Sequence, residues 1–162
     1  MKRDYKLRPI QEKDNAPVAG LIRSNLKQHG LDIPGTAYFD PHIDRFYDFY
    51  AGRTGCGYYV LVDSADKVVG GIGFDTIDKA SCVAELQKMY LDDSVKGQGL
   101  GYVLIRFVEE KMQEAGIKVS YLETHTNLRA AIHIYEKMGY HAVEPPAQVG
   151  HSTMDHFYRK EL

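Results

Sequence analysis

Three glycines at alternate positions, Gly97, Gly99 and Gly101, constrain the fold of this chain more than any other feature. They follow a strand pattern over residues 81–91 and open residues 101–115, where apolar side chains recur with helical spacing. Backbone N–H groups at a helix N-terminus, with the helix dipole behind them, form an anion site. The turn is therefore predicted to bind a phosphate or pyrophosphate, with Lys96 as an added cation, although a glycine-rich turn without a ligand is the alternative.

Two common phosphate-binding loops do not fit these glycines. A Walker A loop is excluded because no Lys-Ser or Lys-Thr pair follows them. A dinucleotide fingerprint reads G-x-G-x-x-G directly after its strand, whereas here residues 92–96 intervene and the glycines alternate. Glu123 lies about where a ribose-binding acid would, but the remaining ~60 residues cannot complete a doubly wound sheet. A dinucleotide-binding protein is therefore the least favoured interpretation of these glycines.

The remaining residues alternate between strand and helix patterns. Period-two segments predict strands at residues 5–10, 58–62, 67–74, 81–91, 119–123, 140–143 and 155–161. Helical spacing predicts a first helix capped at Asp14 or Asn15 and ended at Gly30, a short aromatic one beginning at Asp40-Pro41, and two more over residues 101–115 and 127–139. The order β-α-α-β-β-β-α-β-α-β-β predicts an α/β fold in which helices flank a mixed sheet.

Composition excludes several classes of protein. A length of 162 residues with 44% hydrophobic content predicts a single domain over residues 1–162. A net charge of −2 without a basic run argues against nucleic acid or a membrane surface as partner. We expect a cytoplasmic protein, because no stretch resembles a leader or a membrane span. Cys56 and Cys82 are predicted to be small buried apolar side chains, with a disulfide between them as the alternative, and the seven histidines show no metal-ligand spacing.

Two motifs resemble the GNAT superfamily of N-acyltransferases. Lys96-Gly-Gln-Gly-Leu-Gly101 is similar to the [RQ]-x-x-G-x-[GA] loop that holds the acyl-CoA pyrophosphate in that family. Residues 127–140, NLRAAIHIYEKMGY, resemble its N-x-x-A-x-x-x-Y-E-K-x-G-[FY] segment, and residues 84–91 occupy the place of its central fourth strand. Lys96 replaces the usual Arg or Gln, and Asp93 stands where Pro is common.

The resemblance implies a GNAT-like fold, with a mixed, mostly antiparallel sheet of about seven strands, acetyl-CoA as co-substrate and no metal. Main-chain amides of the central strand would pair with the pantetheine arm. The residues that the resemblance assigns to the cofactor are Met89, Tyr90, Leu91, Lys96, Gly97, Gln98, Gly99, Leu100, Gly101, Tyr102 and Asn127, the last also predicted as a helix cap.

Glu85 and Tyr135 are the candidate catalytic residues. An amine with a pKa of ~10.4 is protonated at neutral pH, so its attack on a thioester requires a base or a water relay. Glu85 is the only carboxylate in the central strand, where alternation predicts that it shares a face with Gln87 and Met89. The alternatives are an ion pair with Lys88 or a solvated strand start. By the resemblance, Tyr135 protonates the CoA thiolate, although its spacing also fits the core.

The resemblance implies that residues 29–56, which are rich in aromatic and acidic side chains, and the last loop shape the acceptor pocket. Asp40, Asp44 and Asp48 recur every four residues, so they would line one helix edge near Tyr47 and suit a cationic amine, unless that edge is only solvated. Residues 144–154 are predicted to close over the acceptor. His125, at a strand end near the cofactor groove, is a weaker acid–base candidate.

The sequence thus predicts transfer of an acetyl group from acetyl-CoA to a primary amine by direct attack in a ternary complex. No cysteine lies in the loop or in residues 83–91, which favours direct attack. A non-catalytic acyl-CoA-binding regulatory or sensor domain is the alternative. The sequence does not distinguish a small amine from a peptide amine as acceptor, and it leaves open whether two copies pair as a homodimer.

Overall fold

A single mixed sheet organises the structure, a computed structural model that describes residues 4–162. Its strand order is β1-β2-β3-β4-β5-β7-β6. The strands are β1 (Lys6–Pro9), β2 (Cys56–Val62), β3 (Val68–Asp78), β4 (Val83–Leu91), β5 (Val119–Thr124), β6 (His141–Ala142) and β7 (His156–Glu161). Only β4 and β5 pair in parallel among these neighbours. The predicted mixed, mostly antiparallel sheet is confirmed.

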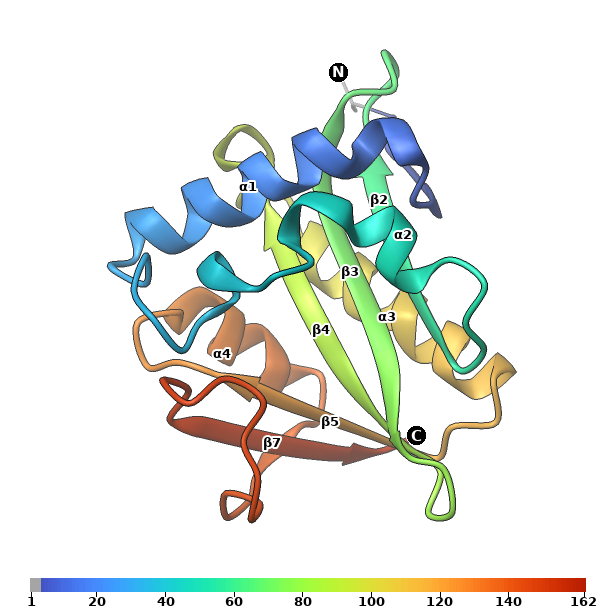
Figure 1. Ribbon diagram of the computed structural model, residues 1–162, viewed down its shortest axis with the longest axis vertical. Helices are drawn as coiled ribbons and strands as arrows, with labels where there is room; N and C mark the ends of the chain where they lie inside the picture. Colours follow the sequence, from blue (N-terminus) through green and yellow to red (C-terminus); the bar gives the residue numbers. More distant parts are fainter. Residues whose placement is uncertain (1–3) are drawn as a thin grey trace.

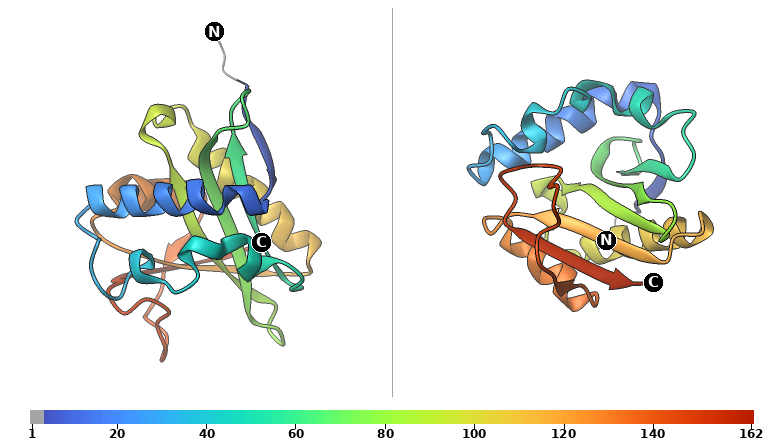
Figure 2. Two further views of the ribbon diagram at one scale, coloured as in Figure 1. Left: turned by 45° about the horizontal axis from the view of Figure 1, so that its top comes forward. Right: turned by 60° about the horizontal axis from the view of Figure 1, so that its bottom comes forward.

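Helices cover both faces of the sheet. They are α1 (Asn15–Gln28), α2 (Phe46–Tyr50), α3 (Leu100–Glu114) and α4 (Arg129–Lys137), with short 3-10 turns at η1 (Glu12–Asp14), η2 (Ala37–Phe39), η3 (Ile43–Arg45) and η4 (Asp93–Val95). α1 and α2 lie on one face, whereas α3 and α4 lie on the other (Figures 1 and 2). The chain order of strands and helices predicted from the sequence is also confirmed.

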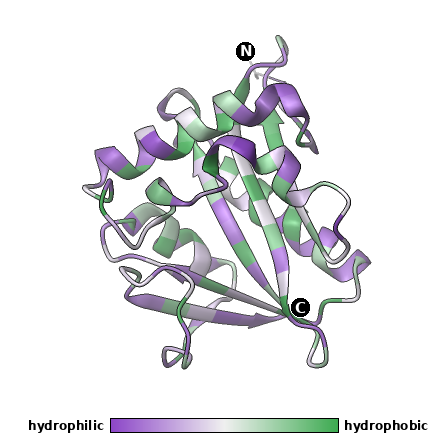
Figure 3. Cartoon of the chain, viewed as in Figure 1, coloured by the Kyte–Doolittle hydropathy of each residue, from purple (hydrophilic) through white to green (hydrophobic). Residues whose placement is uncertain are grey.

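Each face buries its own apolar layer. Leu104, Ile105 and Met112 of α3 are completely buried in a layer that includes Leu86 of β4. On the other face, Ile22 of α1 packs in a layer with residues of β2 and α2. Burying such side chains contributes roughly 1.5–3 kcal/mol each. β4 is nevertheless coloured hydrophilic along much of its middle (Figure 3), so this strand carries polar groups between the two layers.

The sheet opens between its two parallel strands. β4 and β5 pair only from Val83 to Glu85 on one side and from Val119 to Tyr121 on the other. Beyond Glu85 the strands diverge like the arms of a V (Figure 1). Because no strand fills this opening, the facing backbone edges of β4 and β5 border a space in the centre of the fold.

A β-bulge at Lys88 interrupts the alternation of β4. Gln87 lies opposite Gly73, but Tyr90 lies opposite Gly71, and Lys88 adopts a left-handed φ of 54°. The Tyr58 hydroxyl donates to the Lys88 carbonyl at 2.8 Å and so holds the bulge. Tyr90 therefore packs in the layer of α1, while Met89 packs in the opposite one with Leu86. The prediction that Met89 shares a face with Glu85 is wrong.

Two predicted helix starts are also wrong. No helix begins at Asp40-Pro41, because a residue before proline is driven to extended conformation, and Asp40 has ψ 132°. α2 starts only at Phe46, so Asp40 and Asp44 share no helix edge. Asn127 does not cap α4; its side chain donates to the His29 carbonyl at 2.9 Å.

Cys56 and Cys82 form no disulfide and are half-buried rather than buried as predicted.

Candidate active site

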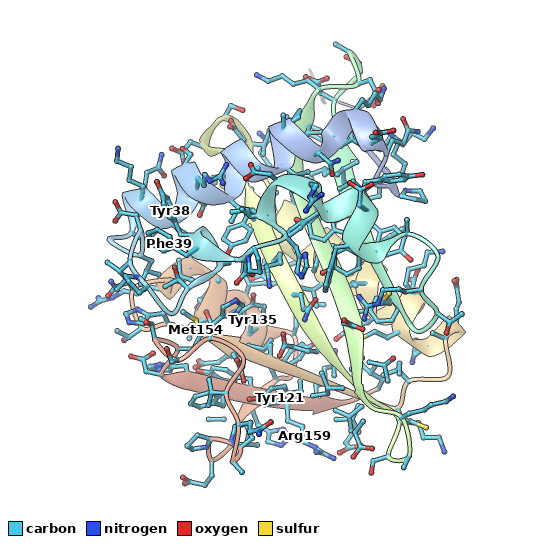
Figure 4. All side chains as sticks on the ribbon, viewed as in Figure 1. Tyr38, Phe39, Tyr121, Tyr135, Met154 and Arg159 are labelled. Atoms are coloured by element: carbon cyan, nitrogen blue, oxygen red, sulfur yellow. The ribbon has the colours of Figure 1, made fainter. Side chains whose placement is uncertain are left out.

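A cavity of about 510 Å³ occupies the opening between β4 and β5. β4 contributes every residue from Glu85 to Leu91. The turn over residues 97–101, called the glycine turn below, contributes Gly97 and Gly99, and Lys96 just before it also lines the cavity. The remaining wall comes from the ends of α1 and β5, from η2, from the start of α3, from α4 and from the loop before β7: Asn25, Leu26, His29, Ala37, Leu100, Gly101, Tyr102, Glu123, Thr124, Leu128, Ala130, Ala131, His133, Ile134, Tyr135, His151 and Met154. Tyr135 and Met154 are labelled in Figure 4.

The glycine turn forms one end of this cavity. Gly97 and Gly99 have φ values of 76° and 74°, which L-residues rarely adopt, and no heavy atom lies within 4 Å of where their Cβ atoms would be. At Gly101 a Cβ would lie 2.7 Å from Ile134 Cδ1, so this glycine lets α3 approach α4. The start of α3 therefore offers backbone N–H groups to an open, side-chain-free space, as an acyl-CoA pyrophosphate requires.

Lys96 lies beside this turn and forms an ion pair with Asp93 at 2.7 Å. Both side chains are substantially exposed, so the pair contributes little to stability, and Lys96 remains available to an anion in the turn.

Glu85 occupies the other end, where β4 leaves β5. Its Oε1 accepts a hydrogen bond from Gln87 Nε2 at 2.9 Å, and Gln87 Oε1 accepts one from the Tyr50 hydroxyl at 2.7 Å. Burial raises the pKa of Glu85, and the negative charge of Glu123 raises it further against the hydrogen bond from Gln87. The carboxyl group is therefore held in one orientation and has a higher proton affinity than an exposed glutamate.

Glu123 lies close to Glu85 but has different partners. A Cβ built on Gly150 would lie 3.2 Å from Glu123 Oε1 and 3.9 Å from Glu85 Oε2. Glu123 accepts hydrogen bonds from the Tyr121 hydroxyl at 2.9 Å and from the backbone N–H groups of Gly150 and His151 at 2.9 and 3.3 Å. Glu123 thereby fastens the loop before β7 across the cavity.

Tyr135 projects from α4 into the cavity between the two ends. It is only 6% exposed and packs on Tyr140, with ring centroids 5.9 Å apart. Its hydroxyl forms no hydrogen bond with any residue from 4 to 162. Burial raises its pKa, so the phenol keeps its proton at neutral pH. It is thus a neutral donor open to the cavity.

Six of the residues predicted for the site do not line this cavity. Asp44 forms an ion pair with Arg23 at 2.7 Å, Asp48 is exposed, and the Tyr47 N–H donates to Asn15. His125 accepts from the N–H of Asn127, whose own side chain binds His29, and Gln98 accepts from the Tyr5 hydroxyl. The acidic wall expected from Asp44 and Asp48 therefore lies outside the cavity.

Sequence reasoning missed a polar cluster at the Glu85 end. Lys88 Nζ lies 3.2 Å from Asp40 Oδ2, and His151 Nε2 lies 2.8 Å from Asp40 Oδ1. Asp40 and His151 are 111 positions apart, so no local pattern links them. The bulge that turns Lys88 toward Asp40 likewise has no signature in the strand's composition.

The sheet opens between two parallel strands, with a glycine-rich helix start at one end of the cavity and Glu85 at the other, and the match to a sequence family identifies the class of protein as an acyltransferase. The sequence profile described as the acetyltransferase (GNAT) family matches residues 24–140. The chain belongs to this family.

Individual relatives agree with this assignment. An uncharacterized N-acetyltransferase of Escherichia coli (strain K12), YjgM, is 34% identical over 140 residues, covering 85% of this chain and 83% of that protein. A GNAT acetyltransferase from Staphylococcus aureus Mu50 has the same fold, with a TM-score of 0.84 at 17% identity over 98% of this chain and 99% of that one. PaiA N-acetyltransferase from Thermoplasma acidophilum, solved with coenzyme A, gives 0.76 at 17% identity over 98% and 99%.

Within residues 4–162 no group of three or more His, Cys, Asp or Glu side chains could hold a metal ion. No helix in the same range is long and apolar enough to cross a membrane.

Proposed function

We propose that this chain transfers an acetyl group from acetyl-CoA to a primary amine, by direct attack of the amine within a ternary complex. The observation that carries the proposal is the cavity itself, which connects the glycine turn to Glu85 along the unpaired edge of β4. The turn and this edge would hold the cofactor, whose thioester supplies an activated acyl group. A solved structural neighbour is bound to coenzyme A, which supports this choice of co-substrate.

Glu85 is proposed to receive the proton that the ammonium form of the acceptor must lose. Its raised pKa keeps it a better proton acceptor than an exposed glutamate, and Gln87 holds its orientation. Such a base typically accelerates a reaction 10²–10⁴-fold. Tyr135 is proposed to donate its phenolic proton to the departing thiolate, because its hydroxyl is neutral and forms no hydrogen bond within residues 4–162.

Direct attack is proposed because neither cysteine reaches the cavity. Cys56 begins β2 and Cys82 precedes β4, and neither side chain lines the site. An acyl-cysteine intermediate therefore has no nucleophile in place.

Steady-state kinetics with acetyl-CoA and a panel of primary amines test this proposal. We expect release of free CoA that depends on the amine, with initial-velocity lines that intersect when both substrates are varied. Glu85→Gln should lose at least a hundredfold in kcat/KM, whereas Glu110→Gln, at an exposed position of α3, should not.

Parallel lines would instead indicate a covalent intermediate and refute direct attack. Stabilisation by acetyl-CoA without turnover of any amine would favour the non-catalytic sensor. Stabilisation by a nicotinamide dinucleotide rather than CoA would refute the assignment of the glycine turn.

A further inference from the structure

Lys88 is the cation that β4 places at the Glu85 end of the cavity, which is the end proposed for the acceptor amine. Simple alternation would direct its side chain into the apolar layer with Leu86, but the bulge turns it toward Asp40 instead. The residue keeps a left-handed φ of 54°, and a non-glycine residue in this region is strained. The side chain is only 12% exposed and lines the cavity. Holding the Lys88 ammonium group here therefore costs backbone strain at Lys88 and partial desolvation of the ammonium group.

The ammonium group of Lys88 has one charged partner among residues 4–162. It has three donors, and within residues 4–162 Asp40, at 3.2 Å, is its only ion-pair partner. Asp40 is also shared with His151 at 2.8 Å. Burial alone would raise the pKa of Asp40, but the contacts with His151 and Lys88 lower it. Asp40 is therefore charged, and its two oxygens are already in contact with both side chains. Lys88 therefore has donor capacity left toward the cavity.

The two carboxylates that line the cavity, Glu85 and Glu123, form no ion pair with Lys88 among residues 4–162. Glu85 is bound to Gln87, and Glu123 is bound to Tyr121 and to two backbone N–H groups of the loop before β7. A second cation on the acceptor would be repelled by the Lys88 ammonium group. An anionic group on the acceptor would instead accept a charged hydrogen bond from the Lys88 ammonium group.

Building on the proposed acetyltransferase function, we propose that the acceptor is a small amine that also carries a carboxylate, with the carboxylate bound by Lys88 and the amine facing Glu85. Lys88 is thereby a specificity-determining residue. His151, which lines the cavity beside it, is held by Asp40 at the same end.

Matched acceptors test this assignment. The same amine is offered as carboxylate, as carboxamide and in decarboxylated form to the wild-type protein, to Lys88→Gln, to Lys88→Arg and to Lys79→Gln, an exposed control in the turn after β3. The wild type should prefer the carboxylate at least tenfold in kcat/KM, as expected for a charged hydrogen bond. Lys88→Gln should abolish this preference, mainly through KM for the carboxylate, Lys88→Arg should restore part of it, and Lys79→Gln should keep it.

Equal or faster turnover of the carboxamide or the decarboxylated amine by the wild type would overturn the inference, as would a preference that survives in Lys88→Gln. These outcomes leave acetyl transfer itself intact. If no amine is acetylated, the proposed function fails separately. Calorimetric binding of the carboxylate and the carboxamide to the protein saturated with desulfo-CoA then still decides the role of Lys88, because equal affinities would refute it.

Discussion

Replacing Gly99 by alanine would separate the folding role of the glycine turn from its binding role. Gly99 precedes α3 with φ 74°, and Gly116 follows the same helix with φ 81°. At both positions no heavy atom lies within 4 Å of a Cβ. Gly99→Ala and Gly116→Ala therefore impose the same backbone strain without a clash, but only Gly99 lines the cavity.

The expected magnitudes follow from this geometry. A left-handed conformation costs an L-residue about 1–2 kcal/mol, and the stiffer unfolded chain returns about 0.4–1 kcal/mol. Each variant should therefore lose about 1 kcal/mol, which lowers the melting temperature by roughly 2–4 °C at this chain length. In Gly99→Ala the added methyl group also enters the space proposed for the pyrophosphate. Loss of a charged hydrogen bond there predicts a KM for acetyl-CoA that rises about tenfold or more.

Thermal unfolding with and without acetyl-CoA, together with KM for acetyl-CoA, measures both effects. Similar losses of stability are expected for the two variants, but only Gly99→Ala should lose stabilisation by acetyl-CoA. An unchanged KM in Gly99→Ala, or an equal rise in Gly116→Ala, would refute the reasoning that this end of α3 binds the cofactor.

Three further changes probe the Glu85 end and the bulge. Glu85→Gln should raise the melting temperature at pH 7–8 but not at pH 4. Burial raises the pKa of Glu85, so the stability that the neutral carboxyl group gives the fold at low pH is lost as the pH increases, whereas Gln stays neutral. A pH series of melting curves that shows no trend would contradict this. Tyr135→Phe should lower kcat but leave the melting temperature unchanged, since its hydroxyl has no partner in the described part of the chain, and normal turnover would remove its proposed role. Tyr58→Phe removes the hydrogen bond to the Lys88 carbonyl and should cost about 1–3 kcal/mol in urea unfolding; an unchanged midpoint would show that the bulge does not depend on this bond.

The arrangement of elements was predictable because it follows from local patterns. Apolar spacing in α3 identifies this helix and its buried face, and the continuous apolar run of β2 identifies a strand that is buried on both faces. The glycine turn could also be located, since left-handed φ values at Gly97 and Gly99 require the residue type seen in the sequence.

The acceptor end was less predictable because tertiary contacts define it. Alternation placed Met89 beside Glu85, but the hydrogen bond from Tyr58, on another strand, supports a bulge that reverses the pattern. The acidic pattern at Asp44 reflected a pair with Arg23 rather than a binding wall. Asp40 could have been separated from Asp44 by the proline that follows it, which is the one sequence signal overlooked there.

The divergence of β4 and β5 also bears on how the protein avoids unwanted association. Unpaired strand edges ordinarily invite pairing with other chains, and most proteins carry such edges at the rim of a sheet. Here two edges lie at the centre, and α3, α4 and the loop before β7 surround them. A folded neighbour cannot bring its own sheet edge against them, whereas a thin, extended ligand can enter the cavity. The opening therefore works as a size filter: the pairing capacity of an exposed sheet edge is kept, but it is restricted to ligands no wider than one strand.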